Sequence, residues 1–249
     1  MILELDLGNT YCKWRTLGAD NNVLARGLDD RQRWLEGIFP SLWSGAVERV
    51  RIASVLGDEI ERNLNAQLQT QLNCPVHWVR SQRSCGGVHN AYAKPERLGV
   101  DRWLAMIAAW QRAQRSVLVC DIGSALTIDW VDAGGRHRGG YIIPGPRLMA
   151  ESLRLSTDRV RFDDDQALRS DLDPGMDTGA CVGNGLAVAV TGAVLVAYRR
   201  AEAQGVGPTA LYLTGGYRDA LAQNLRALGV DDLHLEMELV LDGLRIAAP

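Results

Sequence analysis

The sequence has few of the residues that build metal centres and disulfide frameworks. Its five cysteines are scattered singly and form no C-x-x-C pair, which argues against a disulfide framework or a zinc ribbon. Its four histidines show no H-E-x-x-H pattern and no close pairing, which argues against a histidine metal site. Scattered cysteines of this kind fit a reducing compartment, so we expect a cytoplasmic protein.

Long apolar runs and an excess of positive charge are also lacking. We identify no run of about 18 uncharged apolar residues, so no membrane span is expected. The start, MILELDLGNT, carries Glu4 and Asp6 where a signal peptide would need an uninterrupted apolar core. The 27 basic residues against 30 acidic ones give a formal net charge of −3, which disfavours non-specific nucleic-acid binding.

The composition is that of a folded protein. Of the 249 residues, 47% are hydrophobic and 23% are charged. This is enough apolar surface to offset the entropy that a chain loses on folding, which excludes wholesale disorder. The length fits one large domain or two of ordinary size.

An internal repeat is the most informative feature. Residues 2–15 read ILELDLGNTYCKWR and residues 117–131 read VLVCDIGSALTIDWV, each a strand, an Asp-x-Gly turn and a second strand. The two turns lie 115 residues apart, close to half the chain. We therefore predict two similar lobes, residues 1–115 and 116–249. Chance likeness between common Asp-x-Gly turns is the alternative.

Predicted strands and helices alternate along the chain, which indicates the α/β class. The segment 156–174 is charged and weakly periodic, and we expect an exposed loop or short helix there. Strands are predicted at 50–55, 76–79, 128–131, 140–143 and 211–214, and helices at 58–72, 101–114, 146–155, 178–203, 217–228 and in the C-terminal tail.

The first turn contains the elements of a phosphate site. Gly8 is expected to adopt a positive φ and to let a ligand approach closely. Asn9 and Thr10 offer side-chain donors, and Asp6 could hold a hard cation. Together these features suit a nucleoside triphosphate with Mg²⁺, whereas an ordinary hairpin turn is the alternative.

The second turn repeats these elements, with Ser124 in place of an asparagine after Asp121 and Gly123. Two such turns facing each other would hold a polyphosphate from both sides, which is a more specific arrangement than either turn alone. Asp129, further along the second hairpin, is interpreted as a solvent-side strand residue.

Three further segments are candidates. Asp101 begins a predicted helix and suits either an N-cap or a proton acceptor, while Arg102 could bind a carboxylate or a phosphate. The paired glycines of 213–216 follow a strand and would permit close approach to a ligand or simply form a turn. The small residues of 178–196 suit either a buried packing helix or a subunit interface.

Taken in order, these motifs resemble type III pantothenate kinases of the acetate-kinase/sugar-kinase/Hsp70/actin superfamily. The matching segments are DLGNT, the pattern GVxxxY..P..LGVDRW, DIGSALTIDW with GGYIIPG, and LTGG, and they span most of residues 1–247. The resemblance implies a duplicated actin-like (ribonuclease H-like) fold with a nucleotide cleft between its lobes. It also implies ATP-dependent phosphorylation of the primary hydroxyl of pantothenate, the first step toward coenzyme A.

The resemblance also implies roles for individual residues and a homodimer. Asp101 would accept the proton, Asp121 would bind a monovalent cation (K⁺ or NH₄⁺), and Thr178 would reach the pantothenate site of the partner subunit. ATP with Mg²⁺ would contact Asp6, Leu7, Gly8, Asn9, Thr10, Tyr11, Cys12, Lys13 and Ser124, and pantothenate would contact Tyr92, Gly99, Val100, Asp101, Arg102 and Thr178.

The chain departs from the family pattern in a few places. Ser124 stands where threonine is usual and keeps the hydroxyl, Asp177 stands where many members have asparagine, and Cys85 and Gly86 have no evident explanation. Two other functions stay open: a kinase for another small hydroxy acid, and a non-catalytic transcriptional accessory factor that retains the fold.

Overall fold

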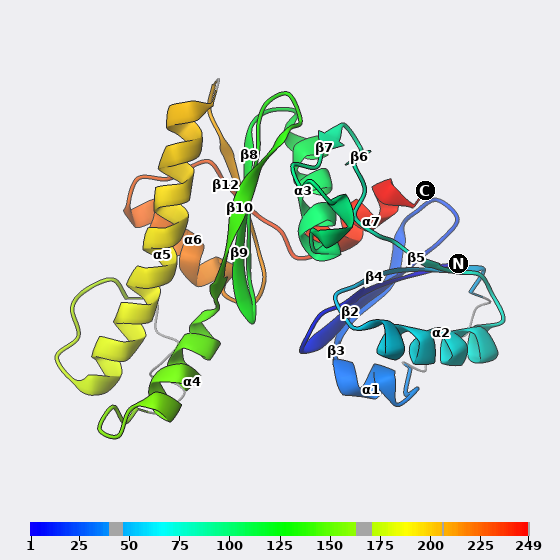
Figure 1. The fold of residues 1–249 in the computed structure, drawn as a ribbon, viewed down its shortest axis with the longest axis horizontal. Coiled ribbons are helices and arrows are strands. Elements are labelled where there is room, and N and C mark those ends of the chain that lie inside the picture. The colour runs from blue at the N-terminus through cyan, green and yellow to red at the C-terminus, as the bar shows by residue number, and fades with distance from the viewer. Residues whose placement is uncertain (40–46, 163–170, 206, 249) are drawn as a thin grey trace. The chain divides into compact units, whose positions relative to one another are not determined.

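The structure, a computed structural model, describes residues 1–39, 47–162, 171–205 and 207–248 (Figure 1). The chain forms two compact units. The first contains Met1–Ala108 and Glu238–Pro249, and the second contains Ala109–Met237.

The first unit is built on a five-stranded mixed sheet in the order β3-β2-β1-β4-β5. Strands β1, β2 and β3 form an antiparallel meander, and β4 and β5 run parallel to β1. One face carries the apolar core with α1 and α2. The elements are β1 (Ile2–Leu7), β2 (Tyr11–Leu17), β3 (Val23–Asp30), α1 (Arg31–Leu35), β4 (Arg49–Ser54), α2 (Asp58–Leu72) and β5 (Val76–Trp78).

The second unit has a sheet of the same design, in the order β10-β9-β8-β11-β12. Its first three strands are again an antiparallel meander, and β11 and β12 are parallel to β8. The predicted duplication is therefore confirmed at the level of topology. The elements are β8 (Val117–Ile122), β9 (Ala125–Val131), β10 (His137–Pro144), α4 (Pro146–Ser156), α5 (Thr178–Gln204), β11 (Ala210–Thr214), α6 (Arg218–Ala227) and β12 (Leu233–Leu235).

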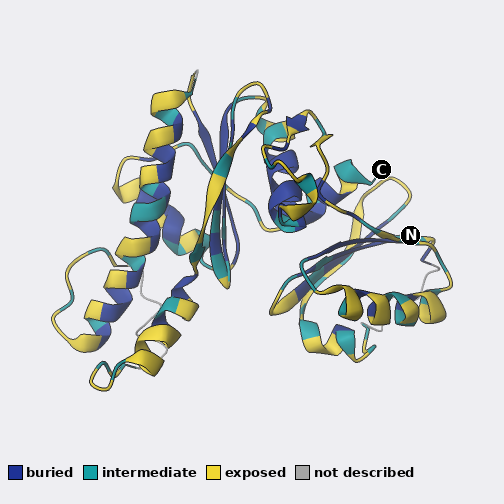
Figure 2. Ribbon diagram, in the orientation of Figure 1, coloured by how far each residue is buried: buried dark blue, intermediate teal, exposed yellow. Residues whose placement is uncertain are grey.

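Helix α2 shows how local sequence sets these elements. Its first turn is acidic, which complements the positive end of the helix dipole, and Leu64 and Leu68 bury one face against the sheet. Asn73 ends the helix in the left-handed conformation, a position that asparagine tolerates. The opposite face is exposed (Figure 2), as the predicted helix at 58–72 requires.

After β5 the chain forms a small hairpin, a short 3-10 helix and a longer helix, which runs across the boundary between the two units. Strands β6 (Ser84–Cys85) and β7 (Val88–His89) pair antiparallel, followed by η1 (Pro95–Arg97) and α3 (Val100–Ala113). The turn between β6 and β7 has positive φ at both Gly86 and Gly87. Two consecutive positive φ angles are what a tight two-residue hairpin needs, and this explains Gly86.

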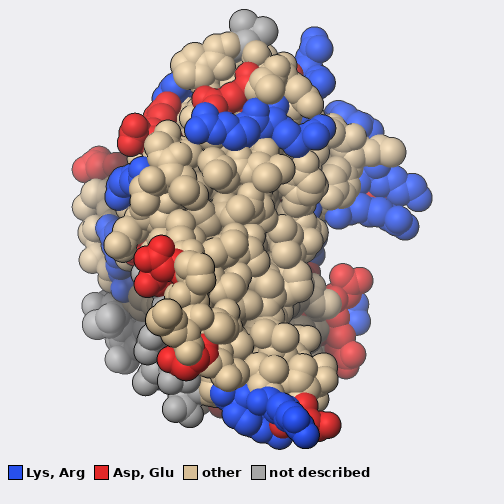
Figure 3. Space-filling view, turned by 90° about the vertical axis from the view of Figure 1, so that its left-hand side faces the viewer, with Lys and Arg blue, Asp and Glu red and all other residues tan. Residues whose placement is uncertain are grey.

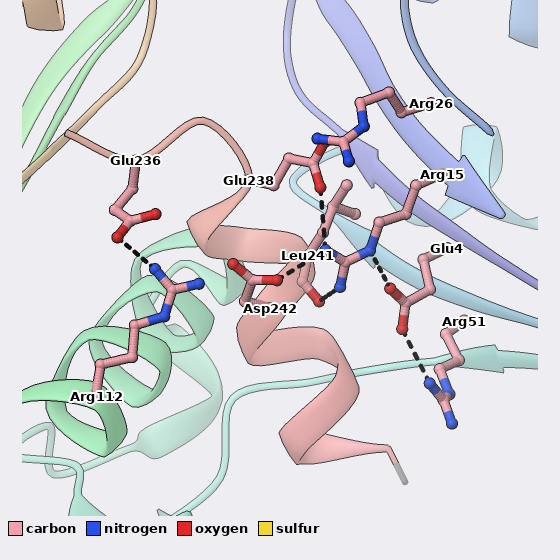
Figure 4. A network of polar contacts seen from close by, with 9 residues as sticks. All are labelled: Glu4, Arg15, Arg26, Arg51, Arg112, Glu236, Glu238, Leu241 and Asp242. Carbon is pink, nitrogen blue, oxygen red and sulfur yellow. Dashed lines mark hydrogen bonds and ion pairs between the residues drawn. The ribbon is translucent and has the colours of Figure 1, made fainter. Parts of the chain in front are cut away.

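The C-terminal helix α7 (Leu239–Ala247) belongs to the first unit, which differs from the lobe boundaries expected from the sequence. Arg15 on β2 fixes it: Nη1 donates to Asp242 (2.7 Å) and Glu238 (3.1 Å), and Nη2 donates to the Leu241 carbonyl (2.8 Å) (Figure 4). The tail thus returns to the sheet of β1 and β2 because an arginine there binds its first turn.

The Arg15 side chain is buried and charged, so its partners must compensate for lost hydration. Its Nε donates to Glu4 (2.7 Å), which also accepts from Arg51 (2.9 Å), and all three are at most 3% exposed. Burial lowers the pKa of Arg15, but the Glu4 and Asp242 carboxylates outweigh this and raise the pKa above its ordinary value.

Helix α5 corrects the expectation that the chain has no membrane-span candidate. Residues 178–198 carry no charge. By length and composition the helix could cross a membrane, since its most apolar stretch of 18 residues has a mean hydropathy of 1.9. Core helices of soluble proteins meet the same criteria. One side of α5 is buried in the core of the second unit through Val190, Val194 and Tyr198, as expected of a packing helix.

The remaining elements separate into those predicted and those missed. Helices α2 to α6 and the closing helix α7 begin and end within about two residues of prediction. The elements that were not predicted are strands β3, β6, β7 and β12, helix α1 and the short 3-10 helix η1. Part of the predicted loop or helix at 156–174, residues 163–170, lies outside the described residues.

Candidate active site

The first Asp-x-Gly turn joins β1 to β2. The Gly8 amide donates to the Tyr11 carbonyl at 3.0 Å and closes the turn. Gly8 does not adopt a positive φ, so that part of the expectation was wrong. Glycine is favoured here by close approach instead, because a Cβ would lie 3.2 Å from the Tyr11 carbonyl oxygen.

The β1–β2 register divides the predicted ATP-contacting residues between two faces of the sheet. Asp6 pairs with Lys13, so their side chains share one face. Leu7 and Cys12 pair on the opposite face and are fully buried in the core. Their side chains therefore cannot touch a ligand at the turn. Burial, with the nearby Asp6 carboxylate, raises the pKa of the Cys12 thiol well above its usual value.

At the tip of the first turn, Asn9, Thr10 and Tyr11 are exposed, and Tyr11 has 48% of its surface accessible. The Thr10 carbonyl accepts from the Arg31 amide at the start of α1 (3.0 Å). The tip is therefore anchored while its side chains face outward, as a ligand-binding loop requires.

The second turn joins β8 to β9 and is more tightly enclosed. The Gly123 amide donates to the Ala125 carbonyl (3.0 Å), and Ser124 is exposed. The Gly145 amide, from the end of the β10 hairpin, donates to the Ser124 carbonyl (2.9 Å). A Cβ at Gly145 would lie only 2.8 Å from that oxygen, so glycine is needed at this position.

The LTGG segment lies directly beside Asp121. Thr214 pairs with Asp121 in the β11–β8 register, and Gly215 follows with φ of 91°. A Cβ on Gly215 would stand 2.5 Å from an Asp121 carboxylate oxygen. The Tyr217 amide donates to the Ile122 carbonyl (3.3 Å), which closes the turn against β8. The predicted glycine pair therefore belongs to the Asp121 site.

Asp121 is the residue at which the sequence predicts a monovalent cation. Within the described residues, no group of three or more His, Cys, Asp or Glu side chains is arranged to hold a metal ion. A single carboxylate is too sparse for a divalent cage made of protein alone.

Asp129 is not the solvent-side residue that the sequence analysis favoured. It is 2% exposed, and its carboxylate lies 3.0 Å from Nε2 of His137, which is also buried. Both residues come from the same hairpin, where β9 and β10 pair. Burial, followed by the Asp129 and Asp121 carboxylates, raises the pKa of the neighbouring Cys120 thiol.

Asp101 lies in the first turn of α3 and is not its N-cap, so the first of the two roles that the sequence left open is wrong. The Trp103 amide donates to the Gly99 carbonyl (3.0 Å), so Gly99 caps the helix and Asp101 lies in its first turn. Its Oδ1 accepts from the Arg102 amide at 2.8 Å. A Cβ at Gly99 would stand 2.6 Å from the same oxygen. The helix start therefore orients the carboxylate and stabilises its negative charge.

The predicted pantothenate residues gather around this helix start. Arg102 is 7% exposed, and its Nη1 donates to the Tyr92 hydroxyl at 3.2 Å. Val100 is 6% exposed, so its side chain packs in the core and only its backbone can line a pocket. The Arg102 guanidinium and the Tyr92 hydroxyl therefore form one polar pair at the start of α3.

Thr178 is the first residue of α5 and is exposed. Asp177 precedes it as the N-cap, with Oδ1 accepting from the Ala180 amide at 2.8 Å. Asparagine and aspartate cap equally well, which explains why aspartate is tolerated at this position.

Comparison with known proteins identifies relatives along the whole chain. The family model for type III pantothenate kinase matches residues 2–200. A type III pantothenate kinase of Marinobacter nauticus is 39% identical over 249 residues, covering 100% of this chain and 98% of that one. Another, from Ectopseudomonas mendocina, is 36% identical over 255 residues, with 100% and 99% covered.

A solved structure shows the same fold at lower identity. A Campylobacter jejuni protein, provisionally described as a Baf family transcriptional activator, superimposes with a TM-score of 0.61 at 21% identity, covering 98% of this chain and 95% of that one. Two units of repeated actin-like topology agree with this likeness. Because both the family model and the full-length relatives match, the chain belongs to the type III pantothenate kinase family.

Proposed function

We propose that the chain is a cytoplasmic, homodimeric enzyme that transfers the γ-phosphoryl group of ATP to pantothenate. The observation that carries the proposal is the cluster at the start of α3. There the Arg102 guanidinium meets the Tyr92 hydroxyl beside the oriented Asp101 carboxylate. Arg102 and Tyr92 would bind the substrate carboxylate, which leaves a primary hydroxyl within the range of Asp101.

Asp101 is proposed as the proton acceptor. The substrate hydroxyl oxygen forms a bond to the γ-phosphorus, the bond from that phosphorus to the β–γ bridging oxygen breaks, and the hydroxyl proton passes to Asp101. Phosphoryl transfer depends mainly on positioning and neutralisation of charge, so one carboxylate of ordinary basicity is enough. ADP leaves with the negative charge of the bridging oxygen.

Each turn is proposed to offer groups that bind ATP phosphates. In the first turn, Lys13 supplies a positive charge on the face of Asp6, and the exposed tip offers amide and hydroxyl donors. In the second turn, Ser124 supplies a hydroxyl and Gly145 and Gly215 keep side chains out of the way. Mg²⁺ would arrive with ATP and neutralise its phosphates, with Asp6 as the ligand available in the first unit.

Asp121 is proposed to hold K⁺ or NH₄⁺. Its carboxylate is compatible with such an ion because Gly215 lets the backbone of the turn approach it closely. A bound monovalent cation would neutralise phosphate charge without the rigid octahedral shell that Mg²⁺ demands.

The dimer is proposed to form through the outward side of α5. Cys181, Gly185, Val188 and Val196 are exposed along one stripe, and the position above Gly185 is open space. Figure 3 shows a broad area free of charged side chains on the side of the molecule where α5 lies. Small residues let two helices approach closely, and Thr178 at the start of α5 would then reach the partner subunit.

The dimer has a direct test. Gly185→Leu would fill the open position and is expected to convert the dimer to a monomer in sedimentation equilibrium. The matched control is Ala203→Leu, which adds the same side chain at an exposed position near the end of α5. Gly205 is not suitable for this purpose, because a side chain there would clash with the Ala201 carbonyl. A Gly185→Leu protein that remains dimeric would move the interface elsewhere.

The catalytic proposal is tested by ATP- and potassium-dependent phosphorylation of pantothenate, set against a panel of other small hydroxy acids. Pantothenate should be strongly preferred, and equal rates across the panel would point to a broader hydroxy-acid kinase. Asp101→Asn is expected to lower kcat by about 10²–10⁴-fold while ATP binding stays near wild type. Unchanged turnover in this variant would exclude Asp101 as the base. No observation favours a non-catalytic accessory role.

A further inference from the structure

The loop that carries Tyr92 is held by side chains that the proposed mechanism does not use. Tyr92 lies between β7 and η1, in a stretch with little regular hydrogen bonding of its own. A residue in such a stretch keeps a fixed position only if side chains satisfy the surrounding backbone groups. The contacts around Asn90 and Arg83 do this.

Asn90 bonds three separate points of the loop. It is 5% exposed, its Oδ1 accepts from the Tyr92 amide at 2.9 Å, and its Nδ2 donates to the carbonyls of Gln82 (3.2 Å) and Pro95 (3.3 Å). Its own amide donates to the Arg83 carbonyl at 2.9 Å. One buried amide side chain therefore joins the segment before the β6–β7 hairpin to Tyr92 and to Pro95.

Arg83 holds the same segment from the solvent side. Its Nη1 donates to the Tyr92 carbonyl (3.1 Å) and its Nη2 to the Ala93 carbonyl (3.2 Å). The planar guanidinium spans two successive carbonyls, a geometry that a lysine ammonium cannot reproduce. Tyr92 is thus fixed by Asn90 at its amide and by Arg83 at its carbonyl.

The far end of the loop is tied in the same way. The buried Ser81 hydroxyl donates to the Leu98 carbonyl at 2.8 Å, one residue before Gly99. This bond fixes the chain that leads into α3, where Asp101 and Arg102 lie. The distance of 3.2 Å between the Tyr92 hydroxyl and Arg102 is therefore set by contacts on both sides of the loop.

We propose that Asn90 and Arg83 are positioning residues for the acid-substrate site: they hold Tyr92 against Arg102 and so determine the affinity for pantothenate without touching it. This inference rests on the proposed function, because it assigns the Tyr92–Arg102 pair to the substrate. Neither residue reaches the reacting atoms, so the chemical step itself should be affected little.

Arg83→Ala is the decisive variant, because its side chain is exposed and its loss should not unfold the protein. We expect the KM for pantothenate to rise about 10-fold, with kcat within about 3-fold and the KM for ATP unchanged. Arg83→Lys should recover only part of the loss. Arg97→Ala removes another exposed arginine of the same loop and is the matched control, expected to behave as wild type.

Asn90→Ala should raise the KM for pantothenate more than Arg83→Ala does. Hydrogen exchange at the Tyr92 amide should also become faster. Where Asn90→Ala fails to fold, Arg83→Ala still decides the question. A wild-type KM for pantothenate in Arg83→Ala, or an equal loss in Arg97→Ala, would overturn the inference. Absence of pantothenate phosphorylation by the wild-type enzyme would instead overturn the proposed function.

Discussion

The two Asp-x-Gly turns occupy the same place in two sheets of the same topology, yet their surroundings differ. Asp6 faces Lys13 across the first hairpin, whereas Asp121 faces Thr127 across the second. The second connection is also one residue shorter, since β8 ends at Ile122 and β9 begins at Ala125. Duplication therefore preserved the strands while the residues at the turns diverged.

The difference teaches how one repeated unit can supply two kinds of charge. The first turn places the Lys13 ammonium group opposite Asp6 on the same face of the sheet, and a positive charge there would attract phosphate. In the second turn, Gly215 lies so close to the Asp121 carboxylate that no side chain fits at that position. An ATP-using enzyme needs both, because phosphate oxygens must be bound and their charge neutralised.

The largest effect should come from removing the second carboxylate. Asp121→Ala is expected to abolish the activation by K⁺ or NH₄⁺, with roughly a 100-fold or greater loss in cation affinity. The measurement is the initial rate as a function of potassium at constant ionic strength. A variant that still responds fully to potassium would show that the second turn does not hold the cation.

Gly215 and Gly216 form a matched pair that tests the crowding around Asp121. Gly215→Ala imposes a side chain at φ of 91° and against the carboxylate, so we expect the free energy of unfolding to fall by about 2–4 kcal/mol. Gly216→Ala meets no atom within 4 Å and should change it by less than about 0.5 kcal/mol. Urea unfolding measures both, and similar losses in the two variants would contradict the assigned packing.

A substitution of Lys13 tests the role of the positive charge in the first turn. Lys13→Met removes the charge and keeps the length of the side chain, and we expect the KM for ATP to rise about 10-fold with little change in potassium dependence. Thr127→Val at the equivalent register position of the second hairpin is the control, expected to leave the KM for ATP within about 2-fold. An equal rise of the KM for ATP in Lys13→Met and Thr127→Val would contradict the proposed difference between the two turns.

The smallest effect concerns the buried thiols beside the two turns, Cys12 and Cys120. Burial raises the pKa of both, so the folded protein keeps these protons when the unfolded chain loses them near the ordinary pKa of 9.0. Stability from this source is complete below that pH and declines as pH rises above it. Mass spectrometry after thiol labelling at pH 8 should find the partly exposed Cys74 and Cys85 modified faster than the buried pair. Fast labelling of Cys12 would contradict its burial.

Periodicity and turn chemistry predicted most of the elements, and the exceptions have identifiable causes. Strand β3 reads VLARGLDD and lies at the sheet edge, where exposed residues weaken the alternation of apolar and polar positions. Strand β12 is only three residues long, which is too short for periodicity to be recognised. The apolar character of the charge-free stretch in α5 was underestimated, because threonine, asparagine and glycine residues interrupt the run of apolar side chains.

At the candidate site, the sequence marked residue types but could not supply their surroundings. Gly8 was expected to need a positive φ, yet close approach is what favours it. Asp129 was interpreted as a surface residue, yet it is buried, with its carboxylate 3.0 Å from Nε2 of the buried His137. Orientation of a strand residue depends on register and on which face is covered, and neither is local.

The sequence by itself determined the duplicated strand–turn–strand units, the amphipathic helices and the residues that carry the chemistry, because each depends on short-range patterns. Only the tertiary structure decided that Gly145 and Gly215 meet the Ser124 turn from distant parts of the chain, and that α7 returns to the first sheet. These contacts depend on strand order and on buried pairing, such as that of Arg15 with Asp242, which no local pattern encodes.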